Sequence, residues 1–295
     1  MRKEYTVTFT RSGESTGTGW SKSTATAQHG DNFYRAEDSN VVKIKQWDDN
    51  TQFRDESTFN YGTKTGYNLS VNYTFTNPIT YNTSVNAEVV ATPIPYLIRF
   101  SKGTGISSIK YRTSSSAAFV EAPNSTFIDY NTTIQWYADV SSGYTGNNTG
   151  SSSSPNSVTV TGATTISATA TVNKYSLTLT KNSNVASLSY RVGSSGNYTT
   201  VTSTTTVANI DFNSALYLYA TAATGYSVPN TVSNPVETTM PVNGYTYSPT
   251  ATINKHSLIL TIGSKVSSIS YKIGTSGTYT TVSSNTTVPN VNYNS

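Results

Sequence analysis

The chain has 295 residues, of which only 12% are charged, and a formal net charge of +4. Frequent Val, Ile and Tyr beside this low charge indicate a folded chain rather than a disordered one, and the absence of cysteine excludes disulfides and thiolate chemistry. The positive charges are scattered, which argues against a nucleic-acid partner, and no stretch approaches the ~20 apolar residues of a membrane span.

The N-terminal sequence MRKEYTVTFTRSG is charged at its start and then alternates apolar and polar residues. It has no apolar core of the kind found in secretory signal peptides. The alternation from Tyr5 predicts a strand with one buried face, and it resembles the first strand of the repeats that follow. We therefore expect residues 1–95 to form an N-terminal β domain.

We interpret this first domain as a divergent copy of the later repeats. Tyr5 precedes Tyr96, the start of the next copy, by 91 residues, which exceeds the later period, so we interpret residues 31–61, approximately, as an insertion. Residues 1–64 hold 18 of the chain's 34 charged residues. A Gly-Tyr dipeptide marks the later part of each copy: Gly66-Tyr67, Gly143-Tyr144 and Gly225-Tyr226.

The clear copies start at Tyr96, Tyr175 and His256, with periods of 79 and 81 residues. Internal repeats decide the fold class, because each copy is one structural unit. The predicted units are a β repeat at 96–174, a second at 175–255 and the first half of a further repeat at 256–295.

Within a repeat the side chains follow a period of two. Leu188 and Tyr190 alternate with Ser189 and Arg191, as in a strand with one dry and one wet face, and Gly-Ser and Pro-Asn stretches between such runs are typical of turns. The sequence predicts an all-β protein of tandem small antiparallel domains, β-sandwich or β-grasp-like repeats of about 80 residues, that form an elongated fibre. Three domains of that size predict a rod of roughly 90–100 Å.

The repeats resemble a known family. A first strand YSLTL from Tyr175, a middle segment ATAATGY from Ala220 and a closing run VTGATTISATA from Val160 look like divergent internalin-type B-repeats. The resemblance implies a compact β-grasp-like module on an extracellular or virion surface, and no chemistry. In overall style the chain is similar to surface fibre proteins of crAss-like tailed phages.

No constellation predicts catalysis. The two histidines are His29, in a turn-like sequence, and His256, which replaces the tyrosine at the start of a repeat. Motifs for metalloproteases, phosphate-binding loops and α/β-hydrolases are absent, so we expect no enzyme and no cofactor. An acidic group has oxygen ligands for Ca²⁺, but a solvated charged loop is the preferred interpretation: Asp48, Asp49, Asn50, Asp55 and Glu56.

Outward-facing aromatic residues allow stacking on sugars. Tyr137 and Tyr219 occupy equivalent positions, as do Gln135 and Tyr217. Cross-strand pairing is the preferred interpretation of the tyrosines. Trp136 aligns with Leu218, an inward position, and is expected in the core.

Three functions fit the repeats: a virion protein of a tailed phage, as a head fibre, capsid decoration or tail fibre; a bacterial surface adhesin or stalk; and an array of carbohydrate-binding modules. The missing signal peptide favours the virion protein. Residues 1–95 are expected to dock on capsid or tail proteins, because a large aromatic residue beside mixed charges is typical of an interface. The alternative is a terminal capping unit, which needs no partner. The predicted docking residues are Trp47, Phe53, Arg54 and Lys45.

The repeats are then expected to project outward as a homo-oligomer, a dimer or trimer, toward a tip that meets a host-surface glycan or protein. The half-repeat at 256–295 lacks the counterpart of the LYLYA strand that begins at Leu216. A half-sheet exposes an apolar face and an unpaired edge. We therefore expect the native chain to continue past Ser295, or a partner chain to supply the missing strands.

Overall fold

A computed structural model describes residues 1–14, 16–49 and 51–295, and all regular secondary structure in these ranges is β. The all-β class and the series of small β domains are thereby confirmed. The chain divides into two compact units. Unit 1 comprises Met1–Lys102, Ser108–Asp139 and Asn148–Ala168, and unit 2 comprises Gly103–Ser107, Val140–Asn147 and Thr169–Ser295.

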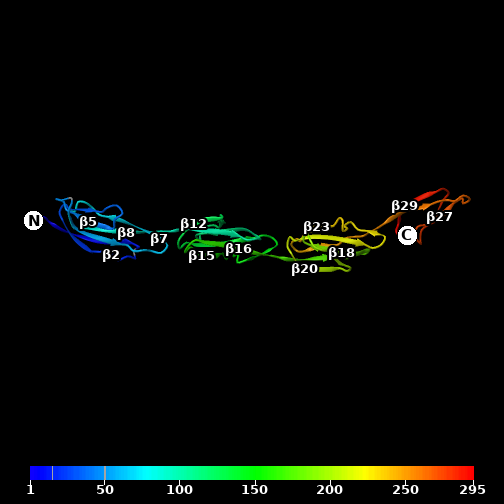
Figure 1. Ribbon diagram of the computed structural model, residues 1–295, viewed down its shortest axis with the longest axis horizontal. Helices are drawn as coiled ribbons and strands as arrows, with labels where there is room; N and C mark the ends of the chain where they lie inside the picture. Colours follow the sequence, from blue (N-terminus) through cyan, green and yellow to red (C-terminus); the bar gives the residue numbers. More distant parts are fainter. Residues whose placement is uncertain (15, 50) are drawn as a thin grey trace. The chain divides into compact units, whose positions relative to one another are not determined.

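The first domain, residues 1–95, lies in unit 1 and is built from two four-stranded sheets. Labelled strands of both sheets lie together in the blue and cyan part of the ribbon (Figure 1). The first sheet has the order β3 (Thr24–Gln28), β1 (Glu4–Gly13), β8 (Thr83–Pro93) and β7 (Tyr67–Thr74). The second has the order β2 (Gly19–Trp20), β6 (Phe53–Asn60), β5 (Val41–Lys45) and β4 (Asn32–Tyr34).

The core of this domain lies between the two sheets. On β1, Val7 is fully buried while its neighbours are exposed, as the period of two predicts. Inward residues of β4 and β5 meet it from the second sheet. The buried cluster comprises Tyr5, Val7, Phe9, Ala25, Ala27, Phe33, Val42, Ile44, Ile79 and Val85.

Residues 31–61, interpreted above as an insertion relative to the later repeats, are an integral part of the folded domain. They supply three of the four strands of the second sheet, β4, β5 and β6. Ile44 and Phe59 are buried. This segment contributes to the buried core, so it is not an appendage to an otherwise complete domain.

The next strands also form two sheets. Strands β9–β13 and β15 lie wholly or mostly in unit 1, and β16 crosses into unit 2. One sheet has the order β11 (Val120–Glu121), β10 (Ile106–Arg112), β13 (Thr133–Val140) and β15 (Asn156–Thr159). The other has the order β12 (Ser125–Asp129), β9 (Pro95–Lys102), β16 (Thr164–Val172) and β14 (Tyr144–Asn147).

Unit 2 contains a repeat with the same strand orders. One sheet is β20 (Thr205–Asp211), β17 (Lys174–Leu179) and β24 (Tyr245–Tyr247), and a short pair joins β22 (Tyr226–Ser227) to β25 (Thr252–Ile253). The other sheet is β19 (Thr199–Val201), β18 (Val185–Val192), β21 (Ala215–Ala222) and β23 (Val236–Thr239). Its core is built on Leu177, Leu179, Leu188, Leu216 and Leu218.

One parallel pair recurs among the mostly antiparallel strands. It joins the first strand of a repeat to a strand near the end of that repeat: β1 to β8, β9 to β16 and β17 to β24. Alternation of apolar residues identifies strands but not the direction in which they pair, so the sequence did not reveal this feature.

The last segment of unit 2 repeats only the first strands. β26 (Lys255–Leu260) pairs with β29 (Thr286–Asn292), and β27 (Ile269–Tyr271) pairs with β28 (Thr280–Val282). Leu258 is 37% exposed, whereas its counterpart Leu177 is fully buried. The exposure agrees with the apolar face expected of a half-repeat.

Candidate docking site

A buried ion pair lies at one end of the first domain. The side chain of Asp31 is fully buried and accepts hydrogen bonds from Arg54 Nε at 2.6 Å and Nη2 at 3.3 Å. The backbone N–H groups of Gln28, at 2.8 Å, and Trp47, at 3.2 Å, also donate to it. This carboxylate therefore ties together the β3–β4 turn, the segment after β5 and the start of β6.

Burial alone would raise the pKa of Asp31, but the Arg54 hydrogen bond, the backbone N–H groups and the Arg54 charge together hold that pKa below its ordinary value. Asp31 is thus a carboxylate at neutral pH. Arg54 reaches it because of a bulge: Ile44 opposes Asp55 and Lys45 opposes Phe53, which leaves Arg54 as the extra residue on β6. Such a bulge turns a side chain away from the regular alternation.

Trp47 lies beside this pair and is 41% exposed. The Arg2 guanidinium covers its ring, and Arg2 Nη1 donates to the carbonyl of His29 at 3.0 Å. A Cβ built on Gly30 would lie 3.3 Å from Trp47 Cβ, so the β3–β4 turn packs closely against the indole. The indole is therefore held in place while part of it faces solvent.

Phe53 and Lys45 lie on the outer face of the second sheet. Phe53 is 39% exposed, and its ring centroid lies 6.0 Å from that of Tyr34. Lys45 Nζ lies 5.1 Å from the Tyr34 ring centroid, and Lys43 Nζ lies 4.7 Å from that of Phe53. A cation and the aromatic face beneath it attract each other weakly at exposed sites. These four side chains therefore form an aromatic and cationic strip.

The structure therefore brings the four predicted residues to one region as two groups. Trp47 and Arg54 both donate hydrogen bonds to Asp31, whereas Phe53 and Lys45 both belong to the strip. Asp31, Arg2 and Tyr34 were missed by sequence reasoning. A signal existed for Asp31, because an acidic residue directly before the alternating run of a strand can pair with an arginine across the sheet; nothing comparable marked Arg2.

Three of the acidic residues considered as a Ca²⁺ site have separate partners within the domain. Asp55 pairs with Lys22, Glu56 with Lys43 at 3.2 Å, and Asp49 accepts from the Thr51 hydroxyl at 2.7 Å. Asn50 lies outside the described residues. Among described residues no group of three metal-ligating side chains is found.

A second recurring feature is a contact we call the glycine–aromatic clasp. Its three copies pair Gly66 with Tyr130, Gly143 with Phe212, and Gly225 with Tyr293. Each glycine has a positive φ, 79°, 82° and 81° in that order. A Cβ at these positions would lie 2.2, 2.3 and 1.9 Å from the ring, distances that only glycine avoids. The first clasp lies within unit 1 and the other two within unit 2.

Each clasp has the same backbone hydrogen bonds around the residue that links two repeats. In the first, the Ile94 N–H donates to the Gly66 carbonyl and the Tyr130 N–H donates to the Ile94 carbonyl, both at 2.9 Å. Asn173 takes the place of Ile94 in the second clasp and Asn254 in the third, with distances of 2.8 to 2.9 Å. Consecutive repeats are therefore coupled by bonded backbone as well as by covalent continuity.

The tyrosine after the glycine extends the clasp. Tyr67 lies edge-on to Tyr130, with ring centroids 5.6 Å apart, and Tyr144 lies edge-on to Phe212 at 6.0 Å. Edge-to-face pairs of this kind are favourable beyond their buried area. The Gly-Tyr dipeptides that begin at Gly66, Gly143 and Gly225 thus mark the junctions between repeats.

The aromatic residues considered for sugar stacking are engaged within the protein. Trp136 is only 6% exposed, as expected from its alignment with Leu218. Tyr137 lies edge-on to Phe119 and Tyr219 lies edge-on to Tyr198, with ring centroids 4.9 Å apart in both pairs. Tyr217 lies beneath the Arg191 guanidinium at 4.3 Å. These contacts agree with the pairing interpretation.

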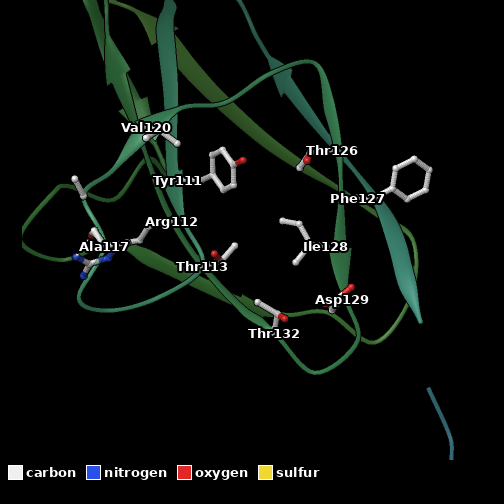
Figure 2. Close-up of a pocket in the computed structure, with 11 residues that line it drawn as sticks. Tyr111, Arg112, Thr113, Ala117, Val120, Thr126, Phe127, Ile128, Asp129 and Thr132 are labelled. Atoms are coloured by element: carbon white, nitrogen blue, oxygen red, sulfur yellow. Dashed lines mark hydrogen bonds between the residues drawn. The ribbon is translucent and has the colours of Figure 1, made fainter. Parts of the chain in front are cut away.

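A cleft of about 460 Å³ opens between β10–β11 and β12 in unit 1. Thr126 and Ile128 point from β12 toward Tyr111, whereas Phe127 points to the other side (Figure 2). The Tyr111 ring is also packed on Phe100, with centroids 5.0 Å apart. The cleft combines hydroxyl groups with an aromatic wall, a combination that suits a polar organic ligand.

No protein-family model matches the chain, and no curated protein matches its sequence. Among solved structures, the chain resembles the Bacillus anthracis TIE protein, with a TM-score of 0.43 and 9% identity over 82% of this chain and 49% of that one. It also resembles the pilus adhesin SpaC from Lactobacillus rhamnosus GG, with a TM-score of 0.24 and 14% identity over 96% of this chain and 44% of that one.

The chain thus spans about half the length of these two proteins. Structural likeness at this level assigns no function, and the resemblance to internalin-type B-repeats stays a prediction. None of the described residues belongs to a helix of the length and apolar character that a membrane crossing requires.

Proposed function

We propose that this chain is a structural protein of a surface fibre, in which the first domain docks on a support and the repeats act as a spacer. The observation that carries the proposal is the clasp, which recurs in three copies with one geometry. A repeat that couples to its neighbour in the same way each time is suited to building length rather than a catalytic cleft.

Small-angle X-ray scattering of the full chain tests the spacer. A globule of 295 residues has a radius of gyration of about 19 Å, whereas a row of three domains about 30 Å across, followed by a half-repeat, has one of about 30 Å or more. We expect the larger value. A radius near 19 Å at low protein concentration would remove the basis of the fibre proposal.

We further propose that the support is a tailed-phage virion, with capsid or tail proteins as partners and the chain as a head fibre, capsid decoration or tail fibre. The composition and the similarity in style to phage surface fibres support this assignment. The bacterial adhesin is the second candidate. Immunogold labelling of source material separates them, because label on phage particles supports the virion protein and label confined to bacterial envelopes contradicts it.

The docking surface is proposed to be the Trp47–Arg54 group together with the strip of Tyr34, Lys43, Lys45 and Phe53. A half-exposed indole held by fixed neighbours is typical of an interface anchor, and the two lysines of the strip suit an acidic partner. Trp47→Ala in the full chain is expected to reduce binding to fibre-free particles at least tenfold, while Tyr279→Ala, an exposed aromatic in unit 2, leaves it unchanged.

The cleft beside Tyr111 favours carbohydrate binding as an alternative for the spacer. A glycan array probed with the full chain tests this alternative. Glycan binding that is lost in Thr126→Val would support carbohydrate binding. An array without signal would contradict it.

A further inference from the structure

Strand β7 is an open edge of the first sheet and the longest edge strand among the described residues. It ends the order β3, β1, β8 and β7, and its eight residues pair with β8 without a shift of register. Its counterpart in the next repeat, β14, has only four residues. A long edge strand carries a row of unpaired backbone groups that can bond to a further strand.

The backbone groups that face the open edge belong to the odd-numbered residues of β7. The Ile94 N–H donates to the Gly66 carbonyl at 2.9 Å, and this pair continues the register of β7 and β8 by one step. Opposed residues of an antiparallel ladder alternate between exchanging both backbone bonds and exchanging none, so the even-numbered residues bond to β8. The N–H and C=O groups of Leu69, Val71 and Tyr73 therefore face the edge, where no described group bonds to them.

The side chains of β7 leave this edge unprotected. Edge strands are commonly guarded by charged residues, proline or a bulge, and the sequence YNLSVNYT of β7 contains no charged residue and no proline. On its outer face Asn68, Ser70 and Asn72 are exposed and uncharged. On its inner face Leu69 and Val71 pack against the core but stay only half-buried, so a further strand would cover apolar area.

The sequence of β7 has two-fold symmetry. From Tyr67 to Tyr73 it is YNLSVNY, which reads the same in both directions except that leucine and valine exchange places. When two such strands pair antiparallel about Ser70, Leu69 of each copy opposes Val71 of the other. Tyrosine then opposes tyrosine, and asparagine opposes asparagine. This register also places odd-numbered residues opposite odd-numbered residues, so the backbone groups that face the two open edges meet each other.

We propose that two copies of this chain form a dimer in which β7 pairs antiparallel with β7 of the second copy about Ser70. The four-stranded first sheets of the two copies then join into one continuous sheet. A two-fold contact uses the same surface on both copies and closes at the dimer, so it excludes the trimer that the sequence left open. The dimer goes beyond the fibre proposal and does not depend on it.

The contact is small. A single pair of edge strands buries less than the roughly 1,200 Å² at the lower end of stable interfaces. We therefore expect a weak dimer with a dissociation constant on the order of 0.1 mM.

Engineered thiols test the register, because the chain contains no cysteine. In Ser70→Cys the two thiols of the dimer oppose each other on Cα atoms about 4.5 Å apart, within disulfide reach. Mild oxidation is expected to give a cross-linked dimer. The matched control is Asn72→Cys, on the same exposed face, where the two thiols lie about 13 Å apart along the strands and are expected to stay unlinked. A mixture of Asn68→Cys and Asn72→Cys chains is expected to cross-link to each other.

Sedimentation of the full chain over a range of concentrations tests the affinity. Ser70→Lys places two like charges opposite each other and is expected to weaken the dimer at least about tenfold. Thr8→Lys adds the same charge to an exposed position of β1, two strands from the open edge, and is expected to leave the dimer unchanged.

Equal cross-linking of Ser70→Cys and Asn72→Cys would mean random collision and would overturn the inference. A chain that stays monomeric up to about 1 mM, or a dimer that survives Ser70→Lys, would also overturn it. None of these results bears on the fibre proposal, which is tested by scattering at low protein concentration and by labelling.

Discussion

Gly143→Ala is expected to be strongly destabilising, although it adds a single methyl group. Alanine at a φ of 82° costs about 1–2 kcal/mol, and its Cβ would lie 2.3 Å from the Phe212 ring, which adds about 1–3 kcal/mol of overpacking. We expect the free energy of opening this clasp to fall by about 2–4 kcal/mol. Hydrogen exchange at the Asn173 and Phe212 amides measures it directly.

Substitutions at two other glycines separate the cost of the left-handed backbone from the cost of the close contact with the ring. Gly193 has a φ of 88° but open space around its Cβ position, and Gly162 has open space without a left-handed backbone. Gly193→Ala is expected to cost about 1–2 kcal/mol, and Gly162→Ala less than about 0.5 kcal/mol. If Gly143→Ala costs no more than Gly193→Ala, the glycine is there for its backbone alone and the close approach of the ring is unimportant.

The sequence predicted where the strands lie better than how they pair. Alternation at Leu188 and Tyr190 identified a half-buried strand, and the alignment of Trp136 with Leu218 placed an indole in the core, because burial leaves a direct trace in residue type. The parallel pairing of first and last strands leaves no such trace. Neither does the bulge at Arg54, because an extra residue interrupts the very alternation by which strands are recognised.

The turn around His29 shows a further limit. The sequence AQHGD around His29 and the sequence IDYNT around Tyr130 share no identical residue, yet they make the same turn with the same backbone bonds. The turn requires positive φ, which glycine and asparagine both supply, and a ring, which histidine and tyrosine both supply. The two turns are therefore equivalent in conformation although their amino-acid sequences differ at every position.

The charged first domain was expected to dock through Arg54, and the structure gives that arginine a partner within the domain. Its bond to Asp31 fixes the start of β6 and, through the Trp47 N–H, the segment that carries the indole. Arg54 thus contributes to the region by positioning Trp47, and 23% of its side chain is exposed.

Asp31→Asn is expected to destabilise the first domain by about 2–4 kcal/mol, because it leaves the Arg54 charge with a neutral partner in a largely buried position. Glu56→Gln, which removes an exposed pair with Lys43 on the neighbouring strand, is the matched control and is expected to cost less than about 1 kcal/mol. Denaturant unfolding followed by tryptophan fluorescence measures both, because Trp20 and Trp47 lie in this domain.

The Asp31 effect is expected to depend on pH in one direction. The folded-state pKa lies below the unfolded value of 3.8, so the carboxylate contributes its full stabilisation above about pH 4 and loses it as the pH falls through the folded-state pKa. The difference between the native chain and Asp31→Asn should therefore be constant from pH 7 to about pH 5 and shrink below pH 4. A difference that stays the same down to pH 2 would mean that Asp31 acts through shape and neutral hydrogen bonds, and that its charge does not hold Arg54 and the Trp47 segment in place.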